Sequence, residues 1–466
     1  MGLSSSRMTT LVLPASISDE LLGLTRLDVE TGAVLLARVV STPDGDLRFL
    51  AKELILVPED AYEYRGYGGL RITSAGFVPQ LGKAEQSATV PFWVHTHPGD
   101  GSSPAPSRRD DIVDADLAPL FRLRSNAAYY GSLICAHHGE ALRFTGFLQD
   151  DVETLRLDRV WSVGSRFMLW SHFTDQHRVL PALFDRNIRA FGGEIQRVLH
   201  GITVAVVGCG GTGSIVAEQL TRLGVRRQLL IDPDSLSASN LTRVYGSQPT
   251  DVGRPKVEVL AEHLRRIAPD SLVTTLQSKI TVEGTARALL GADIVFGCTD
   301  DNAGRLVLSR FATFFLTPVI DCGVLLTSNA EGNIDGIHGR VTILHPGAAC
   351  LVCRGRIDLA RAAAEALTPE EHLVRAGEGY APALGGIEPA VVAYTSMVGA
   401  QAVGELLERL TGYGPQPVPN EVLLRIHDRE ISTNVAHPRI RHYCHPDTGK
   451  LGLGLTDPLL EQSWAA

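Results

Sequence analysis

Thr203-Val-Ala-Val-Val207 runs directly into Gly208-Cys-Gly-Gly-Thr-Gly213, and this stretch predicts the fold class of the second half of the chain. The apolar run has the length and composition of a buried parallel strand, and the glycines permit a tight turn after it. A helix that begins behind such a turn presents backbone N–H groups and the positive end of its dipole to a phosphate. We therefore predict a strand–turn–helix unit that binds a nucleotide.

Short apolar segments and segments with helical spacing continue to alternate beyond this unit. Strands that alternate with helices of about ten residues are typical of a parallel, doubly wound sheet. We expect further strands at residues 228–231, 293–297, 318–321 and 422–427, and helices at residues 214–223, 256–267, 359–367 and 389–410. The predicted fold class is therefore α/β, with a Rossmann-like domain in this part of the chain.

The first part of the chain has a different pattern. Between about residues 33 and 147, short apolar runs alternate with turn clusters, which indicates a mixed α/β domain rich in strands. Residues 150–200 hold many aromatic residues among charges, and we predict helices there that connect two domains. The expected parts are residues 1–149, the connector 150–200, the nucleotide-binding domain 201–430 and a tail, 431–466.

The composition excludes several classes of protein. The 466 residues carry a formal net charge of −9, which argues against a nucleic-acid-binding protein with a basic face. The most apolar helix candidate, residues 389–403, contains Thr395, Ser396 and Gln401 and is too short and too polar to span a membrane. Seven cysteines, an odd number, argue against a fully paired disulfide scaffold and for a reducing compartment. We expect a cytoplasmic protein with no nucleic-acid or membrane partner.

The glycine-rich turn alone does not separate two functions. With Asp232 on the ribose, it would also fit a nicotinamide-dependent dehydrogenase. The residues that follow argue against the dehydrogenase. Asn240 and Arg243, in Asn-Leu-Thr-Arg, and Lys256, in Gly-Arg-Pro-Lys, have no role in hydride transfer. Asp300, in Cys-Thr-Asp-Asp-Asn, then follows a later strand.

Over residues 184–410 this series resembles the ubiquitin-activating-enzyme superfamily, the ThiF/MoeB/HesA-type adenylyltransferases. The resemblance implies that a protein C-terminal carboxylate attacks the α-phosphate of ATP and yields an acyl-adenylate and pyrophosphate. It assigns Gly208, Gly210, Gly211 and Gly213 to the nucleotide turn, Asp232 to the ribose, Asn240, Arg243 and Lys256 to the phosphates, and Asp300 to Mg²⁺.

Phe184-Asp-Arg186 looks like the segment that, in bacterial members, inserts an arginine into the ATP site of the partner subunit. The resemblance then implies a homodimer in which Arg186 acts in trans. The alternative is an arginine of the connector in a surface ion pair.

The densest group of metal-ligating residues is His95-Thr-His97, followed by Ser107-Arg-Arg-Asp110. Histidines two apart on a strand point to the same face, so both can reach one ion. Ser107 is placed to begin a helix that presents Asp110. Two histidines and one carboxylate leave a position open, as in catalytic zinc sites. The alternative is a pair of surface histidines beside a carboxylate at a helix start.

This run resembles the JAMM (JAB/MPN) metalloproteases, although the spacer between His97 and Ser107 is longer than is usual in that family. The resemblance implies zinc-dependent hydrolysis of the peptide or isopeptide bond after a ubiquitin-like C-terminus. It implies that an upstream glutamate is the general base, best matched by Glu53 rather than Glu59 or Glu63, and that Ser107 donates to the oxyanion.

Cys350-Leu-Val-Cys353 and Cys444 could hold a structural zinc, completed by His442, His445 or Asp447. The alternative is an exposed thiol pair and a separate cysteine in the tail. The remaining cysteines, Cys135, Cys209, Cys298 and Cys322, are expected to be small buried residues.

Residues 377–389 precede the last long helix and contain no cysteine, where conjugating members of the resembled family carry one for a thioester. We therefore expect the adenylate to pass to a separate conjugating enzyme, thiol or amine acceptor.

Three functions remain open. The first is a bifunctional enzyme that adenylates the C-terminus of a ubiquitin-like or sulfur-carrier protein and carries a zinc peptidase for the same tail. The second is an adenylyltransferase of sulfur-carrier or small-carboxylate metabolism, whose metal domain processes an adduct. In the third, the metal domain is an inactive binding scaffold.

Overall fold

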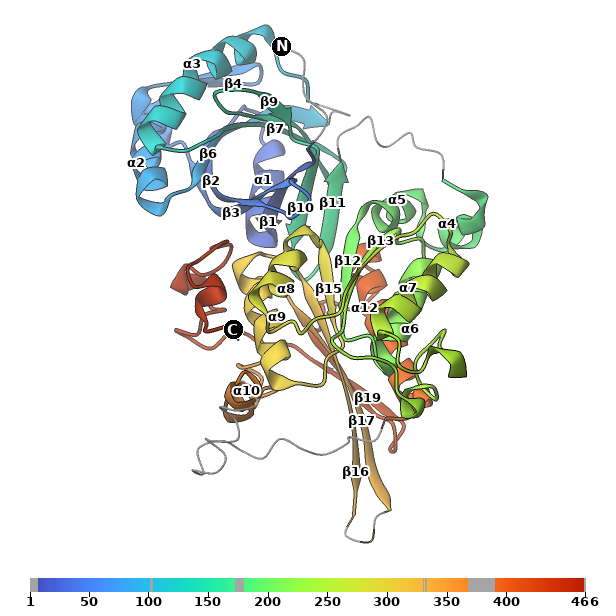
Figure 1. Ribbon diagram of the computed structural model, residues 1–466. Helices are drawn as coiled ribbons and strands as arrows, with labels where there is room; N and C mark the ends of the chain where they lie inside the picture. The colour runs from blue at the N-terminus through green and yellow to red at the C-terminus, as the bar shows by residue number, and fades with distance from the viewer. Residues whose placement is uncertain are drawn as a thin grey trace. The chain divides into compact units, whose positions relative to one another are not determined.

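The computed structural model describes residues 7–100, 104–171, 180–329, 331, 333–367 and 390–464. The chain forms two compact units (Figure 1). Unit 1 comprises Met1–Arg178 and Gly452–Gly454, and unit 2 comprises Val179–Leu451 and Leu455–Ala466. The boundary lies inside the stretch predicted as a connector.

Unit 1 is built on one mixed sheet, as its alternating apolar runs predict. Its strands are β1 (Thr9–Pro14), β2 (Gly32–Ser41), β3 (Leu47–Leu56), β6 (Val90–Asp100), β7 (Tyr130–His138), β8 (Ala141–Gln149), β9 (Thr154–Arg156), β10 (Arg159–Val163) and β11 (Phe167–Ser171), with a separate hairpin of β4 (Tyr62–Gly66) and β5 (Gly69–Ile72). Its helices are α1 (Ala15–Thr25), α2 (Val78–Ser87) and α3 (Arg108–Ser125).

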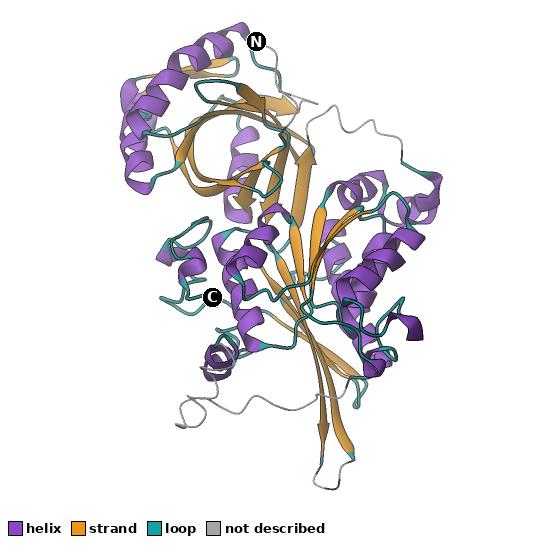
Figure 2. Cartoon of the chain, viewed as in Figure 1, coloured by secondary structure: helices purple, strands orange, loops and turns teal. Residues whose placement is uncertain are grey.

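The strand order of this sheet is β11-β10-β1-β3-β2-β6-β7-β8-β9, and Figure 2 shows the sheet strongly curved. One face buries an apolar cluster with Leu21 of α1, and the other buries a second cluster with Leu81 of α2 and Phe121 of α3. Because both faces of the central strands β2 and β6 are covered, the strands are apolar on both sides. The edge where β6 ends next to α3 carries the metal-ligating residues.

The prediction of helices throughout residues 150–200 is wrong for its first part. Residues 154–171 form β9, β10 and β11 of the unit 1 sheet, and the first α-helix after them among the described residues is α4 (Asp185–Phe191). The aromatic residues are buried as expected, with Trp161 fully covered and Phe167 1% exposed. The segment Arg159-Val-Trp-Ser-Val163 is rich in β-branched and aromatic residues, which favour a strand.

Unit 2 contains the strand–turn–helix unit and the alternation that follows it. Its strands are β12 (Thr203–Val207), β13 (Arg227–Ile231), β14 (Leu272–Leu276), β15 (Ile294–Gly297), β16 (Val319–Ser328), β17 (Ile334–Leu344), β18 (Glu421–Arg425) and β19 (Glu430–Asn434). Its helices are α4, α5 (Gly193–Gly201), α6 (Gly211–Arg222), α7 (Lys256–Ile267), α8 (Glu283–Ala288), α9 (Asn302–Phe314), α10 (Leu359–Glu365) and α12 (Val392–Thr411).

The unit 2 sheet has the order β14-β13-β12-β15-β16-β17-β18-β19. The first five strands are parallel, as predicted, and the last three pair antiparallel. In Figure 1, α6, α7 and α12 cover one face and α8 and α9 the other. In a parallel sheet covered in this way, ligands bind at the carboxyl ends of the strands, where the strand order reverses. Among the described residues, none of the helices is long and apolar enough to cross a membrane.

Candidate functional site

The glycine-rich turn after β12 is tight because its neighbours leave no room for side chains. Gly208 has φ +90°, and a Cβ there would lie 2.6 Å from the carbonyl oxygen of Cys298. A Cβ on Gly213 would lie 1.7 Å from the carbonyl oxygen of Gly208. Only glycine fits at either position, and the turn brings the N-terminus of α6 to the end of the sheet.

A cavity of about 470 Å³ opens at the carboxyl ends of β12, β13, β15 and β16. It collects most of the predicted nucleotide-binding residues from separate parts of the sequence. The predicted residues that line it are Gly208, Gly210, Gly211, Asp232, Arg243, Lys256 and Asp300. The structure therefore brings together the turn, an acidic residue, two cations and a second carboxylate.

Asp232 is 5% exposed and organises the floor of this cavity. Its two carboxylate oxygens accept hydrogen bonds from the backbone N–H of Cys209 at 2.7 Å and of Asp234 at 2.9 Å. Burial raises the pKa of Asp232, against the opposing charge of Lys256. A carboxylate has further lone pairs, so a ribose hydroxyl can be bound without breaking these bonds.

Lys256 is held above the cavity floor by two carboxylates. Its Nζ lies 2.7 Å from Asp234 Oδ2 and 3.8 Å from Asp232 Oδ1. It is the first residue of α7, and it lines the cavity. A phosphate in the cavity would therefore compete with Asp234, which is exposed, for the same ammonium group.

Asn240 and Arg243 share a short turn but face different surroundings. Arg243 lines the cavity and donates from Nη1 to the Ser239 carbonyl at 3.2 Å. Asn240 is buried, is not among the lining residues, and accepts at Oδ1 from the Ser237 backbone N–H at 3.1 Å. In this structure Asn240 orders the turn that carries Arg243, and its predicted contact with phosphate stays a prediction.

Cavity residues from α9 and α10 were not all predicted from the sequence. Asp300 is exposed in the cavity, while Asp301 caps α9 through the Gly304 N–H. Glu365 of α10 lines the cavity and accepts from the backbone N–H of Asn302 at 2.6 Å and of Ala303 at 2.9 Å.

Glu365, its partner Arg361 and Lys279 also line the cavity but belong to no motif, so only tertiary structure reveals them. By contrast, the predicted Arg186 is exposed on α4 and is not among the residues that line this chain's cavity.

In unit 1, the structure brings His95, His97 and Asp110 together. The two Nε2 atoms lie 3.2 Å apart, and Asp110 oxygens lie 3.4 Å from His95 Nε2 and 3.7 Å from His97 Nε2. Burial lowers the pKa of His95 to about 4 and also lowers that of His97. Both rings are therefore neutral near pH 7, with lone pairs available, and the donor set fits zinc.

The loop before α3 holds Asp110 through a capping box. Ser107 accepts at Oγ from the Asp110 backbone N–H at 3.2 Å, and Asp110 Oδ2 accepts from the Ser107 backbone N–H at 2.7 Å. This reciprocal pair fixes the start of α3 and aims the other oxygen of Asp110 at His95. The hydroxyl proton of Ser107, which is exposed, remains available to donate.

Glu53 does not lie beside this cluster in the strand register, and its role as the general base stays a prediction. His95 pairs with Gly32 across β2 and β6, whereas Glu53 pairs with Leu36 of β2. Four residues along a strand separate the two sites by about 13 Å. Glu53 instead forms an ion pair with Lys83 at 2.6 Å.

Glu30 is a second candidate for the general base. It directly precedes Thr31, whose carbonyl accepts a hydrogen bond from the backbone N–H of Thr96, the residue between His95 and His97, at 3.0 Å. Burial and the nearby charge of Asp110 raise the pKa of Glu30 to about 7, although Arg109 lowers it. The sequence signal for this residue is Glu30-Thr-Gly-Ala, directly before the apolar run of β2. The predicted residue, Glu53, lies on the next strand, β3.

In unit 2, Cys350, Cys353, His442 and Cys444 form a second cluster, with His442 rather than His445 or Asp447 as the fourth member. The sulfurs of Cys353 and Cys444 lie 3.7 Å apart, and His442 Nδ1 lies 3.5 Å from Cys350 Sγ and 3.3 Å from Cys444 Sγ. Zn–S bonds of about 2.3 Å imply sulfurs about 3.8 Å apart in a tetrahedron. The cluster therefore fits a closed structural zinc site.

Contacts to the sulfur atoms also bear on metal binding by this cluster. A hydrogen bond from Cys444 lowers the pKa of Cys350, which favours its thiolate form, whereas burial raises the pKa of Cys353. The backbone N–H of Arg439 donates to Cys353 Sγ at 3.4 Å. Donors directed at sulfur stabilise the thiolate form that a metal requires.

The other four cysteines were expected to be buried. Cys135, Cys209 and Cys322 are buried, and Cys298 is half-buried. Cys298 and Cys322 lie at the cavity wall. The stretch without cysteine, residues 377–389, lies outside the described residues.

The two clusters predict separable metal contents. We expect the wild type to hold about two zinc ions per chain, and H95A/D110A and C350S/C353S to hold about one each, because each cluster loses two of its ligands. Elemental analysis of proteins purified without added zinc measures this. The assignment would be contradicted if the two double variants lost the same ion. It would also be contradicted if the wild type held no zinc.

Comparison with known proteins supports the interpretation of unit 2. The relatives include the ubiquitin-like modifier-activating enzyme 5 of Oryza sativa, 32% identical over 165 residues, and the sulfur carrier protein ThiS adenylyltransferase of Escherichia coli, 32% identical over 151 residues. Each alignment covers 32% of this chain, and the chain spans 37% and 56% of those relatives. A crystal structure of E. coli MccB with MccA-N7isoASN matches 56% of this chain and 74% of its own at 18% identity. Its TM-score of 0.45 is too low to support an argument.

The model of the ThiF family matches residues 184–444, which is more than half of the chain. The matched segment includes β12, the glycine-rich turn, all the cavity residues named above and the Cys–His cluster. Unit 1 lies outside it. The protein belongs to the ThiF family.

Proposed function

We propose that unit 2 adenylates the C-terminal carboxylate of a ubiquitin-like or sulfur-carrier protein with ATP. The observation that carries this proposal is the single cavity that combines the glycine-rich turn with Asp232, Arg243, Lys256 and Asp300. The relatives named for activating such proteins share this part of the chain. An oxygen of the carboxylate bonds to the α-phosphorus while the bond to the β-phosphate oxygen breaks, so that pyrophosphate leaves with the electron pair.

The residues of the cavity divide this work. Asp232 binds the ribose hydroxyls, and the N-terminus of α6 faces the phosphates. Arg243 and Lys256 place positive charge where negative charge increases on the phosphoryl groups. Asp300 offers an exposed hard oxygen that fits Mg²⁺, which would neutralise phosphate charge when bound.

Arg186 supports a proposal about assembly. It is exposed on the short helix α4, and Phe184, which directly precedes this helix, is buried. We assign it, on the resemblance described above, to the cavity of a second copy in a homodimer. It is not among the residues that line the cavity of its own chain, which a role in trans requires.

For unit 1 we propose a zinc peptidase or isopeptidase that acts on the same class of protein tail. His95, His97 and Asp110 fit zinc, which would supply a Lewis acid that polarises a carbonyl and acidifies water. Glu30, not Glu53, would accept the proton of water and pass it to the leaving amine. Ser107 would donate its hydroxyl proton to the developing oxyanion.

The two proposed activities share one substrate feature, a flexible C-terminal tail. The peptidase would expose or release this tail, and the adenylation site would activate it. Because residues 377–389 contain no cysteine, a separate conjugating enzyme or thiol or amine acceptor would receive the acyl group.

ATP–pyrophosphate exchange tests the proposal for unit 2. We expect the full chain to exchange labelled pyrophosphate into ATP only when a ubiquitin-like or sulfur-carrier protein ending in Gly-Gly is present. Deleting the final Gly-Gly of the same carrier provides the matched control and must abolish exchange. Exchange with small carboxylates alone would favour small-carboxylate metabolism instead.

Unit 1 is tested separately. If it binds zinc but cleaves no tail, its role is that of a binding scaffold.

A further inference from the structure

A buried chain of charges begins at the cavity wall and continues through the antiparallel half of the unit 2 sheet. Arg305 of α9 lines the cavity, and its Nε lies 3.7 Å from Asp321 Oδ1. Asp321 is fully buried on β16 and meets Arg340 of β17, with Nη2 at 2.6 Å from Oδ2. Gly323 stands opposite Arg340 in the ladder, and a Cβ there would lie 3.1 Å from Arg340 Nη2. The missing side chain leaves room for Arg340 to reach Asp321.

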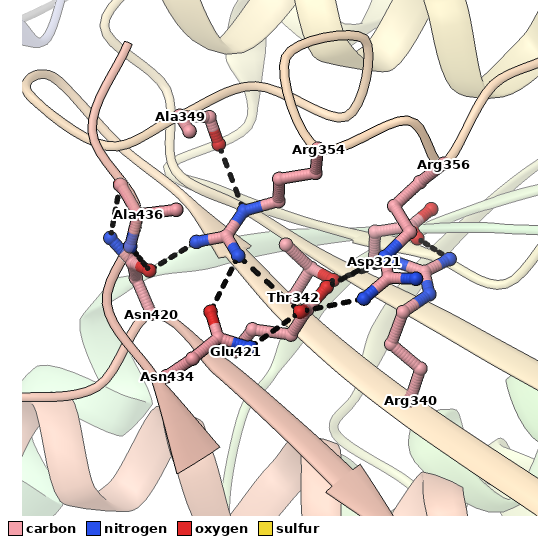
Figure 3. A network of polar contacts seen from close by, with 10 residues as sticks. All are labelled: Asp321, Arg340, Thr342, Ala349, Arg354, Arg356, Asn420, Glu421, Asn434 and Ala436. Carbon is pink, nitrogen blue, oxygen red and sulfur yellow. Dashed lines mark hydrogen bonds and ion pairs between the residues drawn. The ribbon is translucent and has the colours of Figure 1, made fainter.

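The chain of contacts then runs from Arg340 to Glu421. Arg340 Nη1 donates to Thr342 Oγ1 at 2.6 Å, and Thr342 Oγ1 donates to Glu421 Oε1 at 3.0 Å. Arg356 binds both oxygens of Glu421, at 3.1 and 2.9 Å, and Arg354 lies 3.4 Å away. Figure 3 shows these side chains gathered around Thr342 and Glu421. Burial would raise the pKa of Glu421, but hydrogen bonds from Arg356 and Asn434 hold it at about 2.

The arginines of this network pair with two different carboxylates, Glu421 and Asp321. Glu421 is satisfied by Arg354 and Arg356, which leaves Arg340 to Asp321. Arg340 is the closer cation to Asp321, at 2.6 Å, and Arg305 stays at 3.7 Å, although neither oxygen of Asp321 accepts a hydrogen bond from a described residue. Arg305 otherwise donates only from Nη2 to the Cys322 carbonyl, at 3.4 Å, among the contacts of the described residues. Its charge therefore remains available to an anion in the cavity.

We propose that Arg340 is a positioning residue: by neutralising the buried Asp321, it keeps the guanidinium of Arg305 directed at the nucleotide phosphates in the cavity. Without Arg340, the unpaired carboxylate in a low-dielectric site would bind Arg305 closely and withdraw it from the cavity. This inference rests on the proposed function of unit 2. It adds a residue that does not line the cavity itself.

Calorimetric titration of the full chain with MgATP tests the inference. We expect R340Q to raise the Kd for MgATP about tenfold, the loss expected when a hydrogen bond to a charged group is removed. R305Q should raise it similarly. D321N should change it less than about threefold, because without a carboxylate nothing withdraws Arg305. D321N/R340Q should then bind within about threefold of the wild type, a rescue that a merely structural role for Arg340 does not produce.

The controls separate this inference from the proposed function. R340K retains the charge and should bind more tightly than R340Q, and R425Q removes an exposed arginine on β18 and should leave the Kd unchanged. If the wild type does not bind MgATP, the proposed function fails and the inference fails with it. If the wild type binds and R340Q binds equally well, or the double variant is as weak as R340Q, only the inference fails.

The double variant also addresses folding, because it leaves no buried charge unpaired between positions 321 and 340. If R340Q alone does not fold, as judged by circular dichroism, the Kd of the double variant for MgATP is the deciding measurement. A Kd raised about tenfold in that folded protein would overturn the inference.

Discussion

Replacing Lys256 with methionine is expected to lower ATP–pyrophosphate exchange by roughly 10²–10³-fold, the cost of removing one preorganised donor to developing charge. Lys256 is 9% exposed, and Asp234 and Asp232 already hold its ammonium group at the cavity. The cation is thus in place before the nucleotide binds. Methionine retains most of the apolar stem, so the change removes charge more than volume.

Exchange measured with the carrier that activates the wild type is the readout, together with the melting temperature. Lys450→Met is the matched control, because Lys450 pairs with Glu461 away from the cavity. It should leave exchange unchanged. The loss of the ammonium group leaves Asp232 and Asp234 close together, so we also expect Lys256→Met to melt at a lower temperature than the control variant. Exchange that persists in a folded Lys256→Met protein would refute the assignment of this residue.

The nucleotide half of the fold was predictable because its signals are local. An apolar run, a glycine turn and a helix follow one another in the sequence, and Gly213 is required by a steric contact within that unit, whereas Gly208 is required by a contact with Cys298, which is distant in sequence. The strands β14, β17 and β19 were missed. β17 and β19 form hairpins with the strands that precede them, β16 and β18. Glycines and charged residues interrupt the apolar pattern of β17, and β19 has one apolar residue, so neither gives a strong strand signal.

The connector shows how one correct observation can support a wrong element. The aromatic residues of 150–171 are buried, as expected, but they cover a sheet edge as β10 and β11. Burial alone does not distinguish a helix from a strand in a short apolar segment. The alternation of small, β-branched and aromatic residues in Arg159–Val163 was the usable evidence.

The candidate sites were predictable where the ligands are close in sequence. His95, His97 and Asp110 needed only strand periodicity and a helix cap, and the structure brings them within contact distance. The fourth member of the Cys–His cluster was left open among three residues, since sequence does not show which side chain turns inward; the structure selects His442. Glu365 contacts α9 from another helix and had no local signal.

Replacing Glu30 with glutamine is expected to abolish tail cleavage by unit 1 while the same change at Glu53 leaves it intact. A general base contributes about 10²–10⁴-fold, and glutamine cannot accept the proton. Glu30 lies just before β2, and the charge of Asp110 affects its pKa, whereas Glu53 is paired with Lys83 and separated from His95 by four register positions. The two variants remove the same charge from the same sheet, so they share any general effect of that change.

The substrate is a ubiquitin-like protein fused, after its C-terminal Gly-Gly, to a fluorescent reporter, and cleavage is followed by gel mobility. Zinc content is measured on the same samples. We expect both variants to retain the wild-type zinc, because neither glutamate belongs to the His95–His97–Asp110 cluster. Cleavage lost in the Glu53 variant and kept in the Glu30 variant would restore the original assignment. Zinc lost from the Glu30 variant would contradict the assignment of Glu30 as a proton acceptor that does not hold the metal.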